Sequence, residues 1–437
     1  MELGWVDFSS EDRKKLQQIL GWLDDEKNAI DRLGFGVLRD AIADRLFPTT
    51  STLHTRARYL FLISYDLRDL ERSVSSGGKK TTARNLREQY KKKEIKRKRA
   101  LKKACEEAGV STEGIIGINQ TGERWLAQPP IDMYWSAIRE LGLLDTTVCG
   151  GGLQSHYFKY LVSKAVQASN NTGLEKQERL DEGATERDEL VAASCWRNVP
   201  SKEPEACSFD LTKEEALILR NAIIERWNDS FYAFLLQASK NNPFLKAVLG
   251  GAEIQDIGNL ATQGVLPSKY ERIKTDLEMA DSFSSLVYGC YIRFNLQTLE
   301  LAGKDCAEQN KKWNDYIRSE EAKRTTRFDA MDYFQHFSVE NTQAAVLLQR
   351  FCNDAILCMR ECIAHPRSKE PVKKLDEAIL NQELNKKHNL AILYGLQKGH
   401  MKYSNDMQQS EDHMQFRLKE GRMMVSDIRD GLARGNG

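Results

Sequence analysis

The sequence predicts a mainly α-helical protein built from many helices. Only nine prolines occur in 437 residues, so long stretches contain no residue that interrupts a helix. Within these stretches apolar residues recur at helical spacing, most regularly from Ala344 to Cys362, and Pro366 follows closely. No internal repeat of about 20 to 50 residues is present, which indicates a helical bundle and argues against a solenoid.

The N-terminal region, residues 1–104, is expected to consist of successive helices. Hydroxyl and carboxylate side chains at Ser9–Asp12 are typical of a helix start. A second helix is predicted over Leu38–Leu46. The run Tyr59–Ile63 is apolar on every side, which predicts a helix that is buried all round. The region closes with a basic helix at residues 79–103.

The basic helix is the strongest local feature of the sequence. Residues 79–103 contain thirteen Lys or Arg against two Glu, whereas the whole chain has a net charge of only +1. Their composition favours a helix, and Glu88 and Glu94 each precede a lysine by four residues. Few apolar residues are available to bury a full stripe, so most of this helix should be solvated.

Three further segments are expected after the basic helix. Residues 105–167 predict a small α+β unit near 105–145, in the order that winged-helix modules use, followed by one more helix; Gly114–Gly117 would be its extended piece. Residues 168–207 read as an acidic and polar linker with few apolar anchors. A capping box at Thr212–Glu215 then opens a helical C-terminal domain over 208–437.

Catalytic and metal-binding patterns are nearly absent. Neither glycine run, at 150–152 and 250–251, has the lysine of a phosphate-binding Walker loop, and no G-x-S-x-G or H-E-x-x-H motif occurs. Cys358, Cys362 and His365 share one helix face, but a structural zinc site needs a fourth ligand. We therefore interpret these cysteines as core residues and expect no metal and no cofactor.

The composition also bears on location. No stretch approaches the roughly 18 consecutive apolar residues of a membrane span. The first residues have no apolar segment typical of a signal peptide. Nine cysteines are scattered singly, which favours reduced thiols. We expect a cytoplasmic protein that does not enter a membrane.

The segment from Leu46 to Ile63 places His54, Arg56 and Arg58 directly before an apolar block. Three interpretations compete: a cap with salt bridges, a contact to an anion or nucleic acid, or part of a catalytic centre. The structural interpretation is favoured, with Thr50 or Ser51 capping the helix and Asp40, Asp44 or Asp66 pairing with the arginines. Arg56 and Arg58 nevertheless stay among the candidate nucleic-acid contacts.

The basic helix provides the main candidate site. A helix of about 25 residues is roughly 37 Å long, enough to follow a phosphate backbone. The alternative is a solvated helix whose charge is balanced by the acidic remainder of the chain. If the helix binds phosphates, the candidate contacts are Lys91, Lys92, Lys93, Lys96, Arg97, Lys98, Arg99 and Lys103.

Several segments resemble an uncharacterised bacterial family that carries a domain of unknown function. The resemblance is most specific in an LGWxDFS start and a TSTxxTRARY motif, and least in the acidic linker. The segments that carry it are Leu3–Ser9, Leu46–Pro48, Thr50–Tyr59, Met133–Ser136, Leu211–Ala216 and Asp427–Leu432. The resemblance implies a cytoplasmic protein that occurs with helicases and nucleases in phage defence, and it implies no catalytic residue.

Together these observations favour a non-enzymatic accessory subunit of an anti-phage system. It would bind nucleic acid, with DNA expected, through the phosphate backbone, and a partner protein such as a helicase or nuclease through its helical C-terminal half. Two alternatives stay open. One is a hydrolase or nuclease whose site is assembled from residues distant in sequence, and the other is a purely protein-binding scaffold.

Overall fold

The structure, a computed structural model, describes residues 31–77, 81–120, 126–172, 194–205 and 207–434. Within this part the chain is mainly helical, as predicted. Its strand-like pairing is limited to one antiparallel bridge between Leu144 and Trp196. No described helix is long and apolar enough to cross a bilayer. The predicted helix start at Ser9–Asp12, Lys79 and Lys80, and most of the acidic linker lie outside the described residues.

The chain forms two compact units, each assembled from segments far apart in the sequence. Unit 1 comprises Met1–Pro48, Asp229–Phe231 and Ser239–Leu418, and unit 2 comprises Thr49–Asn228, Tyr232–Ala238 and Lys419–Gly437. The division therefore does not follow the boundaries at 104, 167 and 207 that composition suggested, because composition records local character and not long-range packing.

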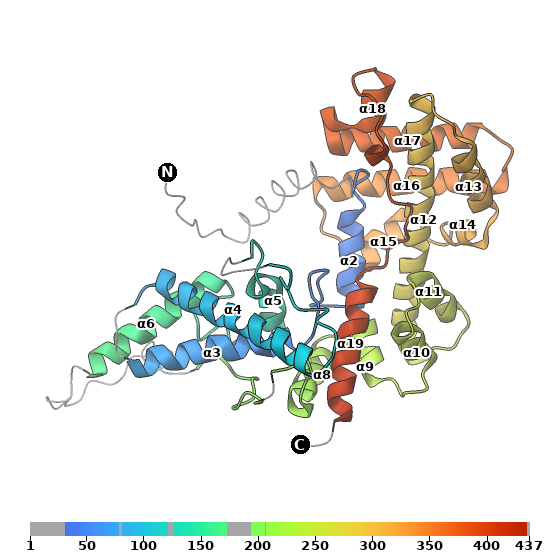
Figure 1. The fold of residues 1–437 in the computed structure, drawn as a ribbon. Coiled ribbons are helices and arrows are strands. Elements are labelled where there is room, and N and C mark those ends of the chain that lie inside the picture. Colours follow the sequence, from blue (N-terminus) through green and yellow to red (C-terminus); the bar gives the residue numbers. More distant parts are fainter. Residues whose placement is uncertain (1–30, 78–80, 121–125, 173–193, 206, 435–437) are drawn as a thin grey trace. The chain divides into compact units, whose positions relative to one another are not determined.

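Unit 1 is organised around one long helix, α12 (Glu271–Leu301), which Figure 1 shows in yellow. Its neighbours, among them α2, α11, α13, α14 and α17, pack around it, so α12 is buried over most of its length. The other helices of the unit are α2 (Gly36–Leu46), α10 (Pro243–Leu249), α11 (Ile254–Thr262), η1 (Ser268–Tyr270), α13 (Ala307–Arg318), α14 (Glu320–Arg324), α15 (Ala330–His336), α16 (Gln343–Ala364), α17 (Glu370–Lys387), η2 (His388–Leu390), α18 (Ile392–Gln397) and η3 (Asn405–Met407).

Buried charges on α12 are matched by partners from neighbouring helices. Asp276 is fully buried and accepts hydrogen bonds from Arg45 (Nε to Oδ2, 2.9 Å) and His336 (Nε2 to Oδ1, 2.5 Å). Arg293 makes a two-pronged contact with Asp376, with N–O distances of 2.9 and 2.5 Å. Such pairing is required because an isolated buried charge is costly.

Unit 2 is built around α3, whose first turns contain the apolar block of the sequence. Residues Tyr59–Ile63 are all at most 5% exposed, which confirms the predicted buried helix. The helices α4, α5 and α6 pack against α3. The helices of the unit are α3 (Tyr59–Gly77), α4 (Ala83–Glu107), α5 (Pro130–Glu140), α6 (Gln154–Thr172) and α8 (Lys213–Arg226). It also contains α9 (Phe231–Gln237) and α19 (Leu418–Ala433), except for the first residue of each, which is assigned to unit 1.

The small α+β unit expected near 105–145 is not present in the described residues. Gly114–Gly117 forms consecutive turns, because both glycines have positive φ angles of 94° and 72°. The buried Ile115 and Ile116 between them face the core, and the Ile116 amide donates to the Tyr59 hydroxyl at 3.0 Å. An apolar pair between glycines resembles a short strand in sequence, but here the glycines supply a left-handed backbone.

The described end of the predicted linker is packed against α3. The carbonyl oxygens of Val199 and Pro200 accept hydrogen bonds from the buried Arg68 guanidinium at 3.2 and 2.5 Å. Other local predictions are confirmed. The capping box of Thr212 and Glu215 is formed, and α16 ends at Ala364, two residues before the proline that follows it.

Candidate nucleic-acid interface

The basic segment folds as α4, a regular helix of 25 residues. Thr82 caps its start, since its hydroxyl accepts a hydrogen bond from the Asn85 amide at 3.2 Å. Gly109, with a φ of 63°, terminates it, and the amides of Gly109 and Val110 bond back to the carbonyls of the last turn. The interior is rich in Lys, Arg, Glu, Leu and Ala, the residues with high helix propensity.

The inward face of α4 is apolar at its two ends. Leu86 and Tyr90 in the first turns, and Leu101 and Cys105 in the last, are all at most 5% exposed. They pack in the bundle with α3 and α6. The spacing of the four residues places them on one side of the helix, so the opposite side is left to the basic residues.

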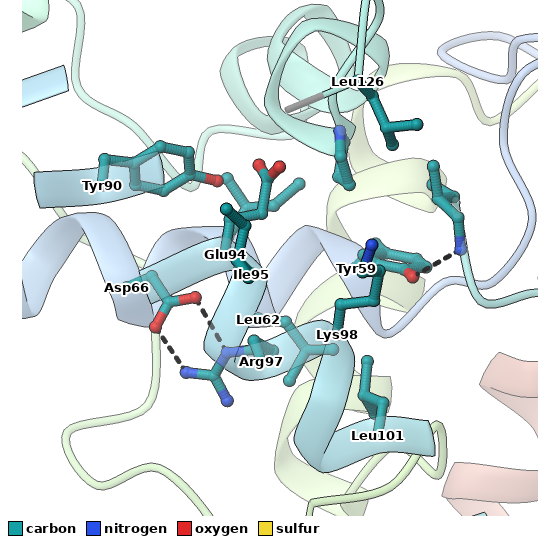
Figure 2. Close-up of a pocket in the computed structure, with 13 residues that line it drawn as sticks. Tyr59, Leu62, Asp66, Tyr90, Glu94, Ile95, Arg97, Lys98, Leu101 and Leu126 are labelled. Atoms are coloured by element: carbon teal, nitrogen blue, oxygen red, sulfur yellow. Dashed lines mark hydrogen bonds and ion pairs between the residues drawn. The ribbon is translucent and has the colours of Figure 1, made fainter. Parts of the chain in front are cut away.

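The middle of the inward face carries charge instead of apolar side chains. Arg97 makes a two-pronged contact with Asp66 of α3, at 2.8 and 2.6 Å (Figure 2). It also binds the Glu203 carboxylate. Arg97 is therefore an anchor between α4, α3 and the segment before α8. Its guanidinium, one of the candidate phosphate contacts, is already occupied by two carboxylates.

The surroundings of this ion cluster determine the charge states of its members. Burial alone lowers the pKa of Arg97, but the hydrogen bonds to Asp66 and Glu203 outweigh it, so the pKa is raised and the guanidinium stays charged. Burial raises the pKa of Asp66, and Arg97 offsets part of that effect. The cluster is thus a paired, desolvated anchor and does not add net positive charge to the surface.

A small pocket lies beside this anchor, between α3, α4 and the start of α5. The centres of water molecules can occupy about 30 Å³ of it, which is two to three times what one buried water requires and well below the size of a cofactor. Tyr90 and Glu94 line it, as Figure 2 shows. Burial is the main cause of the raised pKa of Tyr90, and the negative charge of Glu94 and a hydrogen bond to it raise that pKa further. Lys98, also on its wall, donates to the carbonyl oxygens of Gly117 and Gln120 at 3.3 and 3.2 Å.

The outward face of α4 brings together four of the candidate contacts. Lys92, Lys96, Arg99 and Lys103 follow one another at intervals of four, three and four residues, and all four are exposed. Among the described residues, no carboxylate forms an ion pair with Lys92, Lys96 or Arg99, whereas Lys103 is 3.5 Å from Glu107 in a solvent-exposed pair. The row extends over 12 residues, or about 16 Å along the helix axis.

Three further lysines of α4, Lys91, Lys93 and Lys102, lie at the edges of this row. Lys91 and Lys93 are partly exposed and contact Glu88 and Asp69 at 3.8 and 3.6 Å. Such exposed pairs contribute little free energy and exchange readily with other anions. Lys102 is also exposed beside the row, although we did not single it out from the sequence.

Arg56 and Arg58 do not join the row, because both point into unit 2. Arg56 binds Asp427 of α19 through Nε at 3.1 and 3.0 Å. Arg58 is 2% exposed, pairs with the fully buried Glu215 at 3.1 Å, and donates to the Asp210 carbonyl oxygen.

The structural interpretation of these arginines named the wrong partners and the wrong cap. Asp40 and Asp44 pair with Arg417, and Asp66 pairs with Arg97. The helix α3 begins only at Tyr59, too far from Thr50 and Ser51 for either to cap it. The actual partners are at least 150 positions away in the sequence, so no local pattern could have indicated them.

His54 is also used structurally. Its ring is buried and stacks on Tyr134 with centroids 4.1 Å apart. Nε2 lies 3.1 Å from the Met133 carbonyl oxygen, and Nδ1 accepts from the Ser51 amide at 3.3 Å. One nitrogen must donate and the other must accept, so this arrangement requires the neutral imidazole.

Sequence reasoning missed the carboxylates that fix these basic residues. Asp66 and Glu203 bind the Arg97 guanidinium. Asp427 binds Arg56 and in addition accepts a hydrogen bond from the Ala57 amide at 2.8 Å. The only available signal was position: Glu94 and Arg97 lie on the same helix side as Leu86 and Leu101. Charged residues on an otherwise apolar stripe predict buried partners.

The described residues contain no group of three or more His, Cys, Asp or Glu side chains that could hold a metal ion. Cys362 is buried on α16, Cys358 is half-buried, and His365 lies beyond the helix end and is exposed. Cys362 therefore packs as a core residue of unit 1, whereas Cys358 lies only partly within that core.

The N-terminal part of the chain matches a known family model. Residues 1–165 match the model of a family of unknown function, DUF6361, and this segment includes the whole of α4. No curated protein and no solved structure matches the chain. The N-terminal part of the chain is thus similar to an uncharacterised domain family.

Proposed function

We propose that this protein is a non-enzymatic subunit that binds nucleic acid through the phosphate backbone, on the outward face of α4. One observation supports the proposal: the inward Arg97 is compensated by two carboxylates, whereas three of the four outward cations have no carboxylate partner among the described residues. Arg97 is neutralised by Asp66 and Glu203. In contrast, Lys92 and Lys96 have no ion-pair partner among the described residues.

A row of mostly unpaired cations on a helix attracts a polyanion in two ways. It creates a positive potential that increases the rate of encounter, and each phosphate that it neutralises releases condensed counterions. Because the helix is anchored at its centre by Arg97, the row keeps its geometry before the ligand arrives. No catalytic step is required of any residue on this face.

The test is reversal of the row by the four substitutions Lys92→Glu, Lys96→Glu, Arg99→Glu and Lys103→Glu. Four contacts predict a slope of log affinity against log salt of about −3.6, since each duplex phosphate contributes about −0.9. The variant should stay folded by circular dichroism, because the row buries no apolar surface, while its affinity for duplex DNA at low salt falls roughly 100-fold.

A matched control carries the same change in net charge on unit 1. Its substitutions, all at exposed lysines without a carboxylate partner among the described residues, are Lys240→Glu, Lys311→Glu, Lys373→Glu and Lys402→Glu. This control should lose much less affinity and keep the parent's salt slope. Equal losses in both variants would mean that only total charge matters, and no loss in the row variant would refute the site.

We also propose a cellular role and a protein partner. The resemblance of the TSTxxTRARY segment to a bacterial family that occurs with helicases and nucleases supports a cytoplasmic role in anti-phage defence, with such an enzyme as the protein partner. The same two variants test it: the row variant should lose protection against phage, and the unit 1 control should keep it. If the row variant loses a co-purifying protein but binds DNA normally, α4 is instead a protein-docking surface.

A further inference from the structure

The outward row of α4 also carries information about the form of nucleic acid that it fits. The four cations occupy about 16 Å of helix axis, with neighbours separated by rises of roughly 4.5 to 6 Å. Duplex DNA presents one phosphate charge per about 1.7 Å of its own axis, counted over both strands. A duplex therefore presents phosphate charge at least as densely along its axis as the row presents cations, and it does so without being bent.

Single-stranded ligands need a different surface. Proteins that bind single strands combine cations with exposed aromatic rings, because base stacking offsets the conformational entropy that a flexible strand loses on binding. Tyr90, the one aromatic residue of α4, is 1% exposed and faces the bundle core. The rings nearest in the bundle, such as Tyr59 and Phe158, are buried as well. Within the described residues, the row is therefore flanked by no stacking platform.

Arg97 could have stacked on a base, but its guanidinium is held by Asp66 and Glu203. The exposed side chains beside the row include Arg84, Asn85, Glu88 and Gln89 at one end and Lys102, Glu106 and Glu107 at the other. None of these side chains is an aromatic ring. The chemistry of this face is that of phosphate contact.

We infer that the ligand of this face is duplex nucleic acid and not a single strand, an inference that rests on the proposed function. A duplex is a stiff rod, with a persistence length of about 50 nm, so it meets a rigid helix with little loss of conformational freedom. A single strand would have to be ordered on a surface that offers it no stacking. Binding should be indifferent to base sequence, because phosphates carry no sequence information.

The experiment compares a duplex of about 30 base pairs with each of its separated strands, by fluorescence anisotropy with the full-length protein at several salt concentrations. The duplex should bind roughly tenfold tighter or more, with a slope of about −0.9 per contact against about −0.7 for the strands. A double-stranded RNA of the same length should behave like the DNA duplex. Strands that bind as tightly as the duplex, or more tightly, would overturn the inference.

Two variants keep this outcome separate from failure of the proposed function. If reversal of the row leaves duplex binding unchanged, the α4 site itself is wrong. If reversal weakens duplex and single strand equally and the parent shows no preference, the site holds but the duplex inference fails. Trp125, which lies outside the described residues, is replaced by Ala in the second variant. Suppose the parent binds the single strands as tightly as the duplex, and Trp125→Ala weakens only the single-strand binding. Stacking would then contribute to binding, and the inference would be contradicted.

Discussion

At the scale of single residues, the arginines that precede α3 illustrate how burial decides the role of a charged side chain. Arg58 and Glu215 are 2% and 0% exposed, and the Glu215 carboxylate also accepts from the Tyr65 hydroxyl at 2.8 Å and from the Thr212 amide at 2.8 Å. Glu215 therefore connects the start of α8 to α3. A phosphate could not reach Arg58 without breaking this network.

We predict that Arg58→Ala destabilises the protein strongly. The substitution leaves the Glu215 charge buried without its cation, which costs about 3 to 5 kcal/mol. For a unit of this size the melting temperature should fall by roughly 6 to 20 °C, measured by differential scanning calorimetry. Arg39→Ala, which breaks an exposed pair with Asp40, should change the melting temperature by a few degrees at most.

A second variant separates charge from packing. Replacing the pair by Arg58→Met together with Glu215→Gln removes both charges and keeps most of the side-chain volume. This double variant should recover a large part of the lost stability, because the stranded carboxylate is gone. An Arg58→Ala protein that melts with the parent would contradict the structural role of the arginine.

At the scale of elements, Asp281 shows how α12 and α14 respond to pH together. Asp281 is 1% exposed, and its Oδ2 lies 2.8 Å from Nε of Arg324. Burial and the nearby Glu321 raise the pKa of Asp281, while Arg324, Arg327 and His413 lower it, and the net result is a pKa of about 6. The folded protein therefore binds a proton at Asp281 in a range where the unfolded chain has released it.

The sign of the pH effect follows from that difference. Between about pH 4 and pH 6 the folded state holds more protons at Asp281 than the unfolded state, so this residue's contribution to stability falls as pH rises. Asp281→Asn removes the titration. The free energy of unfolding of the parent, relative to the variant, should decrease by about 2 kcal/mol from pH 4 to pH 7. Urea denaturation at each pH measures it, and a constant difference would exclude the shift.

The same scale shows which parts of the fold could be predicted from sequence. The capping box at Thr212 and the period of α16 are local signals, and the outward row of α4 follows from helical spacing alone. Gly114–Gly117 was misread because positive φ angles leave no trace in an apolar pattern. The partners of Arg56 and Arg97 were missed because Asp427 and Glu203 approach them only through tertiary packing.

At the scale of the whole molecule, unit 2 depends on residues from the far end of the chain. Asp427 of α19 binds Arg56 and the Ala57 amide, and Arg429 donates to the carbonyl oxygens of Leu235 and Ala238 at 3.0 and 2.9 Å. The family match ends at residue 165, before α8 and α19. The matching segment therefore does not contain all of the unit in which its α4 folds.

We predict that deletion of residues 419–437 destabilises unit 2 and leaves unit 1 folded. The deletion removes the buried side chains of Val425 and Ile428, each worth about 1.5 to 3 kcal/mol, and leaves the Ala57 amide without its carboxylate. Unit 1 ends at Leu418 and loses nothing of its own. Amide hydrogen exchange should accelerate in α3 and α4 and stay slow in α12 and α16.

Asp427→Asn in the full-length chain provides the graded control for this deletion. It removes the charge opposite Arg56 but keeps the apolar residues of α19, so exchange in α3 should accelerate less than in the deletion. Because α4 holds the proposed contact row on the same unit, duplex affinity should fall in the same order: parent, Asp427→Asn, deletion. Protection in α3 that is unchanged by the deletion would show that α19 is dispensable for unit 2, and the loss of affinity would then need another cause.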